Sequence, residues 1–518
     1  MASTRRLPER RGALRTGLIL GVLAIGVSTA AIGACVGDDP GGATGNDDGG
    51  SDATNGGDVV TSSDGSNGND SSAPDGSVAT VLEVSSGFNN ACAVLSDGSV
   101  WCWGGDDLGQ LGVASASLAT IASCAGPCSP TPIQINFPTG IKITHVAAGN
   151  HSCAIDTLGD LYCWGENASG ELGHASGASG DAHCSPSNEE CNIAPQKAAG
   201  LADVVKVTIG SADTCALTTS HTVYCWGANY TLALGNSGET DAAIDNPIPT
   251  AVSVLGGKTI IDIDMAKNAP QACAIAQGEG VYCWGYNDFA QLGHATGAGT
   301  PADMPVLGGG LANATPQLVS NTPYATNIAT AQWVSCASAS DDAGHGAGCW
   351  GSNFHGTVGN GTFTTVNGVG TPLTQAAGAQ SNIATIVGGG GGSSAVFCTV
   401  SLDSHLACWG LTGFGEVGNG MFYPADGGSF DAGLFCNDAY CVDSPQALPM
   451  LTKQVSVGYA QALALGTDGK VYAWGLNHYG QLGHAPATAG DKTACTTGFV
   501  SGDAVGPCDP LPTVVTVP

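Results

Sequence analysis

The sequence predicts an all-β fold, a seven-bladed β-propeller with four strands in each blade. Three observations lead to this prediction. A Trp-Gly motif recurs seven times along the 518-residue chain, at intervals of about sixty residues. Each repeat contains four strand-like segments bounded by glycine or proline. The chain has 80 glycines and only 11% charged residues, a composition that suits short strands and tight turns better than long helices.

Residues 1–34 are predicted to be a lipoprotein signal peptide. All five arginines of the chain lie in its first fifteen residues, and an apolar run from Gly17 to about Ile32 follows them. This run is too short and too poorly flanked for a stable membrane span. It ends in "IGAC", which resembles a bacterial lipobox, so we expect cleavage before Cys35 and lipidation of that cysteine. The alternative is an ordinary secretory signal with a chance cysteine.

Residues 35–77 are predicted to be a disordered acidic tether that begins at the lipidated Cys35. The segment consists largely of Gly, Ser, Asn and Asp and has almost nothing to bury. We expect it to act as a spacer between a membrane and the folded part of the chain, residues 78–518.

The charge balance argues against nucleic-acid partners. After residue 34 the chain has no arginine, and eight lysines face forty-two Asp and Glu residues. A body of this charge repels phosphate backbones. No nucleic-acid binding is therefore expected.

The repeats define the blades. The first copy, "CAVLSDGSVWCWGGDDLGQLG", starts at Cys92, and the last, "LALGTDGKVYAWGLNHYGQLG", starts at Leu463 and lacks both cysteines. In each repeat an apolar run comes first, a second strand begins at the first cysteine, a third ends in Cys-Trp-Gly, and a fourth follows a proline. Four-stranded sheets repeated around an axis form a propeller, whose edges stay short and protected. The apolar and polar residues of the strands do not alternate cleanly, which fits sheets covered on both faces.

The string "D-G-x-V-x-x-W-G-x-N-x-x-G-Q-L-G" resembles the repeat of the regulator of chromosome condensation family, and residues 467–483 match it almost letter for letter. The resemblance covers about 440 residues and implies a seven-bladed propeller. The founding members exchange nucleotide on a small GTPase and bind nucleosomes. The exported, acidic, arginine-free body disfavours both activities here and is more similar to the secreted bacterial branch.

The 21 cysteines are assigned as one lipidated residue and ten local disulfides. A hairpin centred on Asp97-Gly98 places Cys92 and Cys102 opposite each other, at a spacing that suits a disulfide. The absence of any C-x-x-C argues against metal or redox chemistry. The six blade pairs expected are Cys92–Cys102, Cys153–Cys163, Cys215–Cys225, Cys273–Cys283, Cys336–Cys349 and Cys398–Cys408. The four loop pairs are Cys124–Cys128, Cys184–Cys191, Cys436–Cys441 and Cys495–Cys508.

The tryptophan after the second cysteine position recurs in all seven copies. A sugar-binding role is conceivable for an aromatic ring, but a residue that every blade carries suits a task that every blade shares. We therefore expect inter-blade packing for Trp103, Trp164, Trp226, Trp284, Trp350, Trp409 and Trp474.

No catalytic, metal or cofactor site is predicted. His174, His294 and His484 follow Leu-Gly in three repeats, but their blades are not all neighbours, so a shared metal site is disfavoured. No calcium loop, nucleophile elbow, P-loop or zincin motif occurs in the sequence.

The loops after the terminal Leu-Gly or Val-Gly are equivalent by repeat symmetry and should emerge on one face. Function tends to lie in such variable loops on a rigid scaffold. All four loop cysteine pairs fall on blades six, seven, one and two, which are consecutive around a ring. We expect either a continuous binding surface or simple protection from proteases.

The predicted function is a non-enzymatic lipoprotein of a bacterial cell envelope, at the outer membrane or cell surface, that presents a propeller to a protein or glycan ligand. The alternatives are a secreted enzyme inhibitor, a glycan-binding adhesin and, less favoured, a propeller enzyme. Nucleotide exchange and chromatin binding are disfavoured.

Overall fold

Each repeat folds into antiparallel strands joined by turns and loops. The structure is a computed structural model that describes residues 79–518 except for 115–117, 119–120, 179, 185–186, 237–244, 268, 300–301, 307–308, 342–343, 363–373, 376–381, 392–394, 423–434, 437–438, 489–490 and 496–505. The predicted signal peptide, Cys35 and the tether lie outside the described residues.

The first three sheets follow the first three repeats. Blade 1 contains β1 (Val81–Ser86), β2 (Asn90–Leu95), β3 (Val100–Gly105) and β4 (Cys128–Gln134). Blade 2 contains β5 (Ile143–Ala147), β6 (His151–Asp156), β7 (Leu161–Glu166), β9 (Glu190–Lys197) and the short outer β8 (Ala182–His183). Blade 3 contains β10 (Val204–Ile209), β11 (Asp213–Thr218), β12 (Val223–Gly227) and β13 (Asn246–Ala251).

The next two sheets follow the same order. Blade 4 contains β14 (Ile260–Met265), β15 (Gln271–Ala276), β16 (Gly280–Tyr286), β18 (Leu311–Leu318) and the outer β17 (Met304–Pro305). Blade 5 contains β19 (Ala325–Ala331), β20 (Val334–Asp341), β21 (Gly344–Gly351) and β22 (Thr374–Gln375). Two 3-10 turns, η2 (Ser253–Leu255) and η3 (Phe354–Gly356), are the only helical elements among the described residues, and none of these could cross a membrane.

Blades 6 and 7 share one long strand, β27 (Ala439–Val457). Its first half pairs with β25 (His405–Leu411) and its second half pairs with β28 (Gln461–Gly466). The other strands of blade 6 are β23 (Ile383–Gly389), β24 (Val396–Ser401) and β26 (Phe435–Cys436), and those of blade 7 are β29 (Val471–Leu476), β31 (Gly506–Val515) and β30 (Lys492–Cys495). The nine-stranded sheet is therefore two blades joined by a strand that turns from the rim toward the axis.

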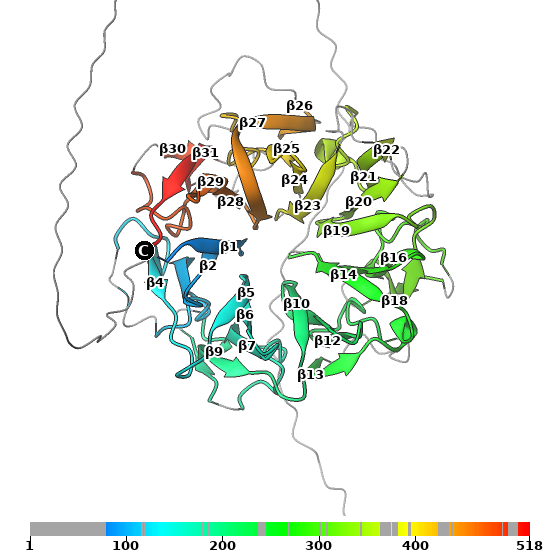
Figure 1. The fold of residues 1–518 in the computed structure, drawn as a ribbon, viewed down its shortest axis with the longest axis horizontal. Helices are drawn as coiled ribbons and strands as arrows, with labels where there is room; N and C mark the ends of the chain where they lie inside the picture. The colour runs from blue at the N-terminus through cyan, green and yellow to red at the C-terminus, as the bar shows by residue number, and fades with distance from the viewer. Residues whose placement is uncertain are drawn as a thin grey trace, which may run out of the picture. The chain divides into compact units, whose positions relative to one another are not determined.

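The predicted all-β fold of seven blades is confirmed. The first strands of the seven blades lie nearest the axis, and the later strands follow outward toward the rim (Figure 1). Each first strand contacts its counterpart in the next blade, including β1 with β27 where the ring closes. The apolar core lies between neighbouring blades, as in the cluster that joins Val84 and Trp103 of blade 1 to Leu463 and Leu482 of blade 7.

Two glycines of the repeat are fixed by backbone geometry. Gly98 turns the β2–β3 hairpin at a φ of 86°, a conformation that glycine adopts without strain. The glycine after each core tryptophan has a φ between 99° and 113°. A Cβ there would lie only 2.1–2.7 Å from a carbonyl oxygen of the turn between the first two strands of the same blade. The glycine of the Trp-Gly pair is therefore required by the backbone of the blade.

Candidate functional site

The structure contains six blade disulfides, each between cysteines directly opposite each other on the second and third strands. Their Cα atoms lie 4.0–4.2 Å apart. In blade 7 the same two positions are Leu463 and Ala473, which face each other in the same register and are fully buried. The apolar pair fills the place of the disulfide.

Three loop disulfides are also present, Cys124–Cys128, Cys184–Cys191 and Cys495–Cys508. Cys441 is disulfide-bonded as well, whereas the side chain of Cys436, its expected partner, lies outside the described residues. Disulfides in this number are typical of proteins kept outside the reducing cytosol. The propeller therefore belongs in an oxidising, extracytoplasmic compartment.

The seven core tryptophans lie between blades. Each is buried, and each indole Nε1 donates a hydrogen bond of 2.7–3.0 Å to a backbone carbonyl in the preceding blade. The acceptor is always the residue two places before the glycine that ends the third-strand turn. In order from Trp103 to Trp474, the acceptors are Gln481, Gln110, Glu171, Ala233, Gln291, Thr357 and Glu416. The tryptophans therefore join each blade to the one before it.

A turn that sequence reasoning missed precedes each of these acceptors. Its first residue is Asn or Asp in six of the seven copies, as in Asn167 of blade 2. In those six, the side-chain oxygen accepts a hydrogen bond from the backbone N–H five residues later. The recurrence of Asn after Trp-Gly-x was the signal for this cap, because Asn and Asp readily bond to nearby backbone.

Two of these turns bury a glutamate. Glu171 and Glu416 each accept a hydrogen bond from the backbone N–H two residues earlier, at 2.9 and 2.8 Å. Burial raises the pKa of each carboxyl to about 8. Glutamine occupies the same position in blades 1, 4 and 7 and accepts the same bond.

The cysteine-bearing loops of blades 6, 1 and 2 each contact a strand or turn of a neighbouring blade. The backbone of Gly420 donates to the carbonyl of Pro510 at 2.9 Å, and Ala125 donates to the carbonyl of His478 at 3.2 Å. The hydroxyl of Ser187 donates to the carbonyl of Asp107 at 3.1 Å. These bonds join blade 6 to 7, 7 to 1, and 1 to 2. A bond from Gly361 to Asp443 adds blade 5.

The three histidines after Leu-Gly do not form one site. Each lies against an aspartate of its own blade, with His174 Nε2 2.9 Å from Asp181, His294 Nε2 2.9 Å from Asp303, and His484 Nε2 3.9 Å from Asp491. Sequence reasoning noticed the histidines but not their partners, because seven residues separate the pair in blades 2 and 7 and nine in blade 4.

Charged side chains that were not predicted gather on the first strands. Lys206 of β10 pairs with Asp262 of β14, which also accepts hydrogen bonds from the side chain of Asn327 and the backbone of Ile328 in blade 5. Asp264 accepts from the backbone and hydroxyl of Thr330 at 2.6 and 2.8 Å. These polar contacts run from one blade to the next, so the charged groups help to hold neighbouring blades together. In the sequence, the alternation of apolar and acidic residues in "IIDIDM" was the pattern that indicated Asp262 and Asp264.

Lys267 follows β14, the first strand of blade 4. Its Nζ donates to the carbonyl of Ser86 in blade 1 and, at 3.0 Å, to that of Val457 in blade 7, although Lys267 belongs to blade 4. Burial lowers the pKa of its amine to about 8, and the carboxylate of Asp264 opposes that shift. The lysine therefore bridges blades that are not neighbours.

The described pockets lie away from the cysteine-bearing loops. One, of about 250 Å³, lies between the β11–β12 hairpin turn and the connection to β14, and is lined by His221, Val252 and Lys258 among others. The other, of about 360 Å³, lies at the equivalent junction one blade earlier and is lined by Leu158, Asp203 and Thr219 among others. Because they recur at equivalent junctions, they reflect blade geometry.

Comparisons with known proteins agree with this architecture. A family model described as "Regulator of chromosome condensation (RCC1) repeat" matches residues 97–155, 159–217 and 468–515, and a second of the same description matches residues 81–110, 143–171, 204–231 and 452–481. Among solved structures, human WBSCR16 covers 81% of this chain and 95% of its own with a TM-score of 0.57 at 17% identity. That likeness shows the fold alone.

Two curated proteins are similar in sequence. The chain is 26% identical over 410 residues to the ultraviolet-B receptor UVR8 of Arabidopsis thaliana, which is 78% of each chain. It is 29% identical over 291 residues to the human E3 ubiquitin-protein ligase HERC2, which is 55% of this chain and 5% of HERC2. The chain therefore matches only a small part of that ligase.

Proposed function

This chain carries regulator of chromosome condensation (RCC1) repeats folded as a seven-bladed propeller, and from that premise we propose that it is a non-enzymatic binding platform of a bacterial cell envelope. Its body is held outside the cytoplasm by a lipid on Cys35 and by the acidic tether. The disulfides support the compartment, and the basic start and "IGAC" of the sequence support the anchor.

The binding surface we propose consists of the cysteine-bearing loops of blades 6, 7, 1 and 2. One observation supports this assignment: the hydrogen bonds from Gly420 to Pro510, Ala125 to His478, and Ser187 to Asp107 hold the loops of blades 6, 1 and 2 against a strand or turn of a neighbouring blade. A surface held in place before binding loses less conformational entropy when a partner docks. The partner is a protein of the envelope.

A glycan ligand is the second candidate, and a different observation favours it. Tyr230 of blade 3 and Phe354 of blade 5 occupy the same position of the turn after the third strand, and each is 43% exposed. Exposed aromatic faces at equivalent positions can stack on the apolar faces of sugar rings. These residues lie outside the blades with disulfide-bonded loops, so the two candidates use different surfaces.

The polar groups near the axis do not favour an enzyme. Lys206, Asp262 and Asp264 bond to each other or to the backbone of the next blade. A catalytic group would instead direct its reactive atom toward a substrate. The ligase and receptor activities in the names of HERC2 and UVR8 are not part of this proposal.

Affinity capture from a cell-envelope extract, followed by mass spectrometry, tests the proposal. The native chain is compared with a variant that lacks two loop disulfides through Cys124→Ser, Cys128→Ser, Cys184→Ser and Cys191→Ser. The control replaces a blade disulfide by the apolar pair of blade 7, through Cys215→Leu and Cys225→Ala. A protein enriched by the native chain and the control, but lost with the loop variant, supports the surface. Equal capture by all three contradicts it, and a hit on a glycan array that Tyr230→Ala abolishes favours the second candidate.

A further inference from the structure

Blades 2 and 4 share a clamp around a buried aspartate. In blade 4, Asp303 Oδ2 accepts hydrogen bonds from Asn287 Nδ2 at 2.7 Å and Gly297 N at 3.0 Å. Its Oδ1 accepts from Asn313 Nδ2 at 3.1 Å and lies 2.9 Å from His294 Nε2. Both carboxylate oxygens therefore have donors.

Blade 2 repeats the arrangement residue for residue. Asp181 Oδ2 accepts from Asn167 Nδ2 at 2.6 Å and Gly177 N at 3.1 Å. Its Oδ1 accepts from Asn192 Nδ2 at 3.3 Å and lies 2.9 Å from His174 Nε2. The asparagine on the fourth strand is thus a regular part of the clamp, opposite the glycine that follows the core tryptophan.

Blade 7 has the same clamp with one exchange. Asp491 Oδ2 still accepts from Asn477 Nδ2 and Ala487 N, both at 2.8 Å. The fourth-strand position opposite Gly475, however, is Asp509 instead of asparagine. A carboxylate that accepts hydrogen bonds therefore replaces the amide that donated one.

The exchange leaves three buried polar atoms without a hydrogen-bond partner. They are Asp491 Oδ1, Asp509 Oδ2 and His484 Nε2. The side chain of Asp491 is fully buried and Asp509 is 4% exposed. Asp491 Oδ1 and Asp509 Oδ2 are buried carboxylate oxygens without a hydrogen-bond donor, which is a costly arrangement unless a cation lies between them.

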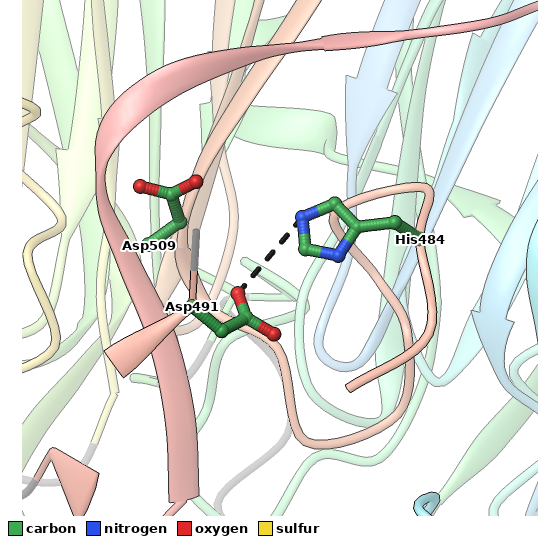
Figure 2. Close-up of side chains that lie close together, drawn as sticks. All are labelled: His484, Asp491 and Asp509. Carbon is green, nitrogen blue, oxygen red and sulfur yellow. Dashed lines mark ion pairs between the residues drawn. The ribbon is translucent and has the colours of Figure 1, made fainter. Parts of the chain in front are cut away.

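We propose that His484, Asp491 and Asp509 bind a divalent metal ion. One ligand atom from each residue lies within 4.8 Å of the other two. Figure 2 shows the imidazole and the Asp491 carboxylate turned toward each other, with Asp509 alongside. The three residues come from the turn and loop after β29 and from β31, so the metal would tie the loop to the sheet of blade 7.

The ligand set selects the class of metal. An imidazole with two carboxylates suits Zn²⁺, whereas Ca²⁺ and Mg²⁺ take oxygen ligands. Three protein ligands leave a position for water, as in open zinc sites. His484 Nδ1 lies 3.4 Å from the carbonyl of Ala485, which can accept its proton when Nε2 coordinates the metal. Nδ1 also lies 2.9 Å from Asn477 Nδ2, a donor for the opposite tautomer of the metal-free state.

The test uses the natural difference between the repeats, which is aspartate in blade 7 and asparagine in blades 2 and 4 at the same fourth-strand position. Asp509→Asn gives blade 7 the clamp of blades 2 and 4, so the variant should fold, and the circular dichroism spectrum checks this. Equilibrium dialysis of the full oxidised chain against Zn²⁺ measures the stoichiometry. Calorimetric titration of the metal-free chain with Zn²⁺ measures the affinity, with Ca²⁺ as the comparison ion. We expect one Zn²⁺ per native chain, a loss of affinity of more than about tenfold in Asp509→Asn, and weaker binding of Ca²⁺.

A reciprocal variant asks whether the exchange is sufficient. Asn313→Asp gives blade 4 the ligand set of blade 7, and we expect a second equivalent of Zn²⁺. Zn²⁺ should also raise the thermal midpoint of the native chain but not that of Asp509→Asn, because a ligand stabilises only the state it binds. Equal zinc binding by the native chain and Asp509→Asn overturns the proposal and leaves the two carboxyl groups as a pair that shares a proton.

Discussion

Trp103 Nε1 lies 3.0 Å from the carbonyl oxygen of Gln481, although 378 residues separate the two in the sequence. This bond closes the ring between blade 7 and blade 1. Two further bonds accompany it, from Val84 N to the side chain of Gln454 and from Ser86 N to the side chain of Ser456, both at 2.9 Å. Among the described strands, no sheet includes members of both blades. The closure therefore depends on packing and on hydrogen bonds between separate sheets, including the backbone bonds from Tyr459 to Gly87 and from Ala125 to His478.

Trp103→Phe should destabilise the propeller measurably. The substitution keeps an aromatic ring in the interface but removes the indole N–H, so the buried carbonyl of Gln481 loses its donor. We expect a loss of about 1–3 kcal/mol, measured as the shift in the urea unfolding midpoint. Trp101→Phe is the matched control, because Trp101 is only partly buried and bonds to the nearby Ser99 hydroxyl at 3.2 Å. Equal shifts for the two variants would contradict the role given to the Trp103 bond.

Leu463→Cys combined with Ala473→Cys should form a seventh blade disulfide. The two residues face each other in the register that six other blades use for their bridges. The new loop has the same length as the loops in blades 1, 2, 3, 4 and 6, and we expect a gain of about 2–3 kcal/mol in the chain-entropy account. Mass spectrometry should find no extra free thiol, and the thermal midpoint should rise. Leu463→Cys alone is the control. Two alkylatable thiols in the folded double variant would show that the register does not suffice.

Glu416→Gln should change how stability depends on pH. The folded-state pKa of Glu416 is raised to about 8 by burial, so the folded chain binds more protons than the unfolded chain between pH 4.5 and 8. The contribution of this group therefore lowers the free energy of unfolding as pH rises through that window. Glutamine keeps the bond from Phe414 N, as glutamine does in blade 7, and removes the charge.

The variant should match the native chain near pH 4 and exceed it above pH 8, by up to a few kcal/mol. Urea unfolding at several pH values measures the difference. Glu279→Gln is the control, because the side chain of Glu279 is 45% exposed and pairs with Lys258. A constant difference between Glu416→Gln and the native chain at every pH would mean that Glu416 has no raised pKa.

Lys267→Met should lower stability and remove a pH dependence of the opposite sign. The half-buried amine has a folded-state pKa of about 8, below that of a lysine in the unfolded chain. The unfolded chain therefore binds more protons between pH 8 and about 10.5, and stability rises with pH in that window. The native chain should gain stability there relative to Lys267→Met. Lys470→Met, at an exposed lysine, should leave the slope unchanged, and an equal slope in all three chains would argue against a half-buried amine.

The repeats allowed the fold to be predicted, because each copy carries its own turns, strands and glycines. Opposed positions such as Cys92 and Cys102 follow from hairpin register, and that inference is local. The contacts between blades are not local. The acceptor of Trp103 lies in the last repeat, and no spacing in the sequence points to Gln481. Likewise, Asp509 can be recognised as a candidate metal ligand only when its strand is placed opposite Gly475 and beside Asp491. The function of the loop face depends on a partner and stays a prediction.

The tryptophan hydrogen bond gives each blade the same donor toward one neighbour and the same acceptor toward the other. Every repeat carries an indole donor for the blade before it and a turn carbonyl for the blade after it. Any two successive repeats can therefore make the same contact. A ring of this kind can gain or exchange blades when whole repeats are duplicated or shuffled. Closure needs no specialised end piece, since the last repeat offers the first one the same carbonyl that every other neighbour receives. The number of blades is then limited by the angle between neighbouring sheets. The loops of any one repeat can vary during evolution while the contacts between blades stay the same.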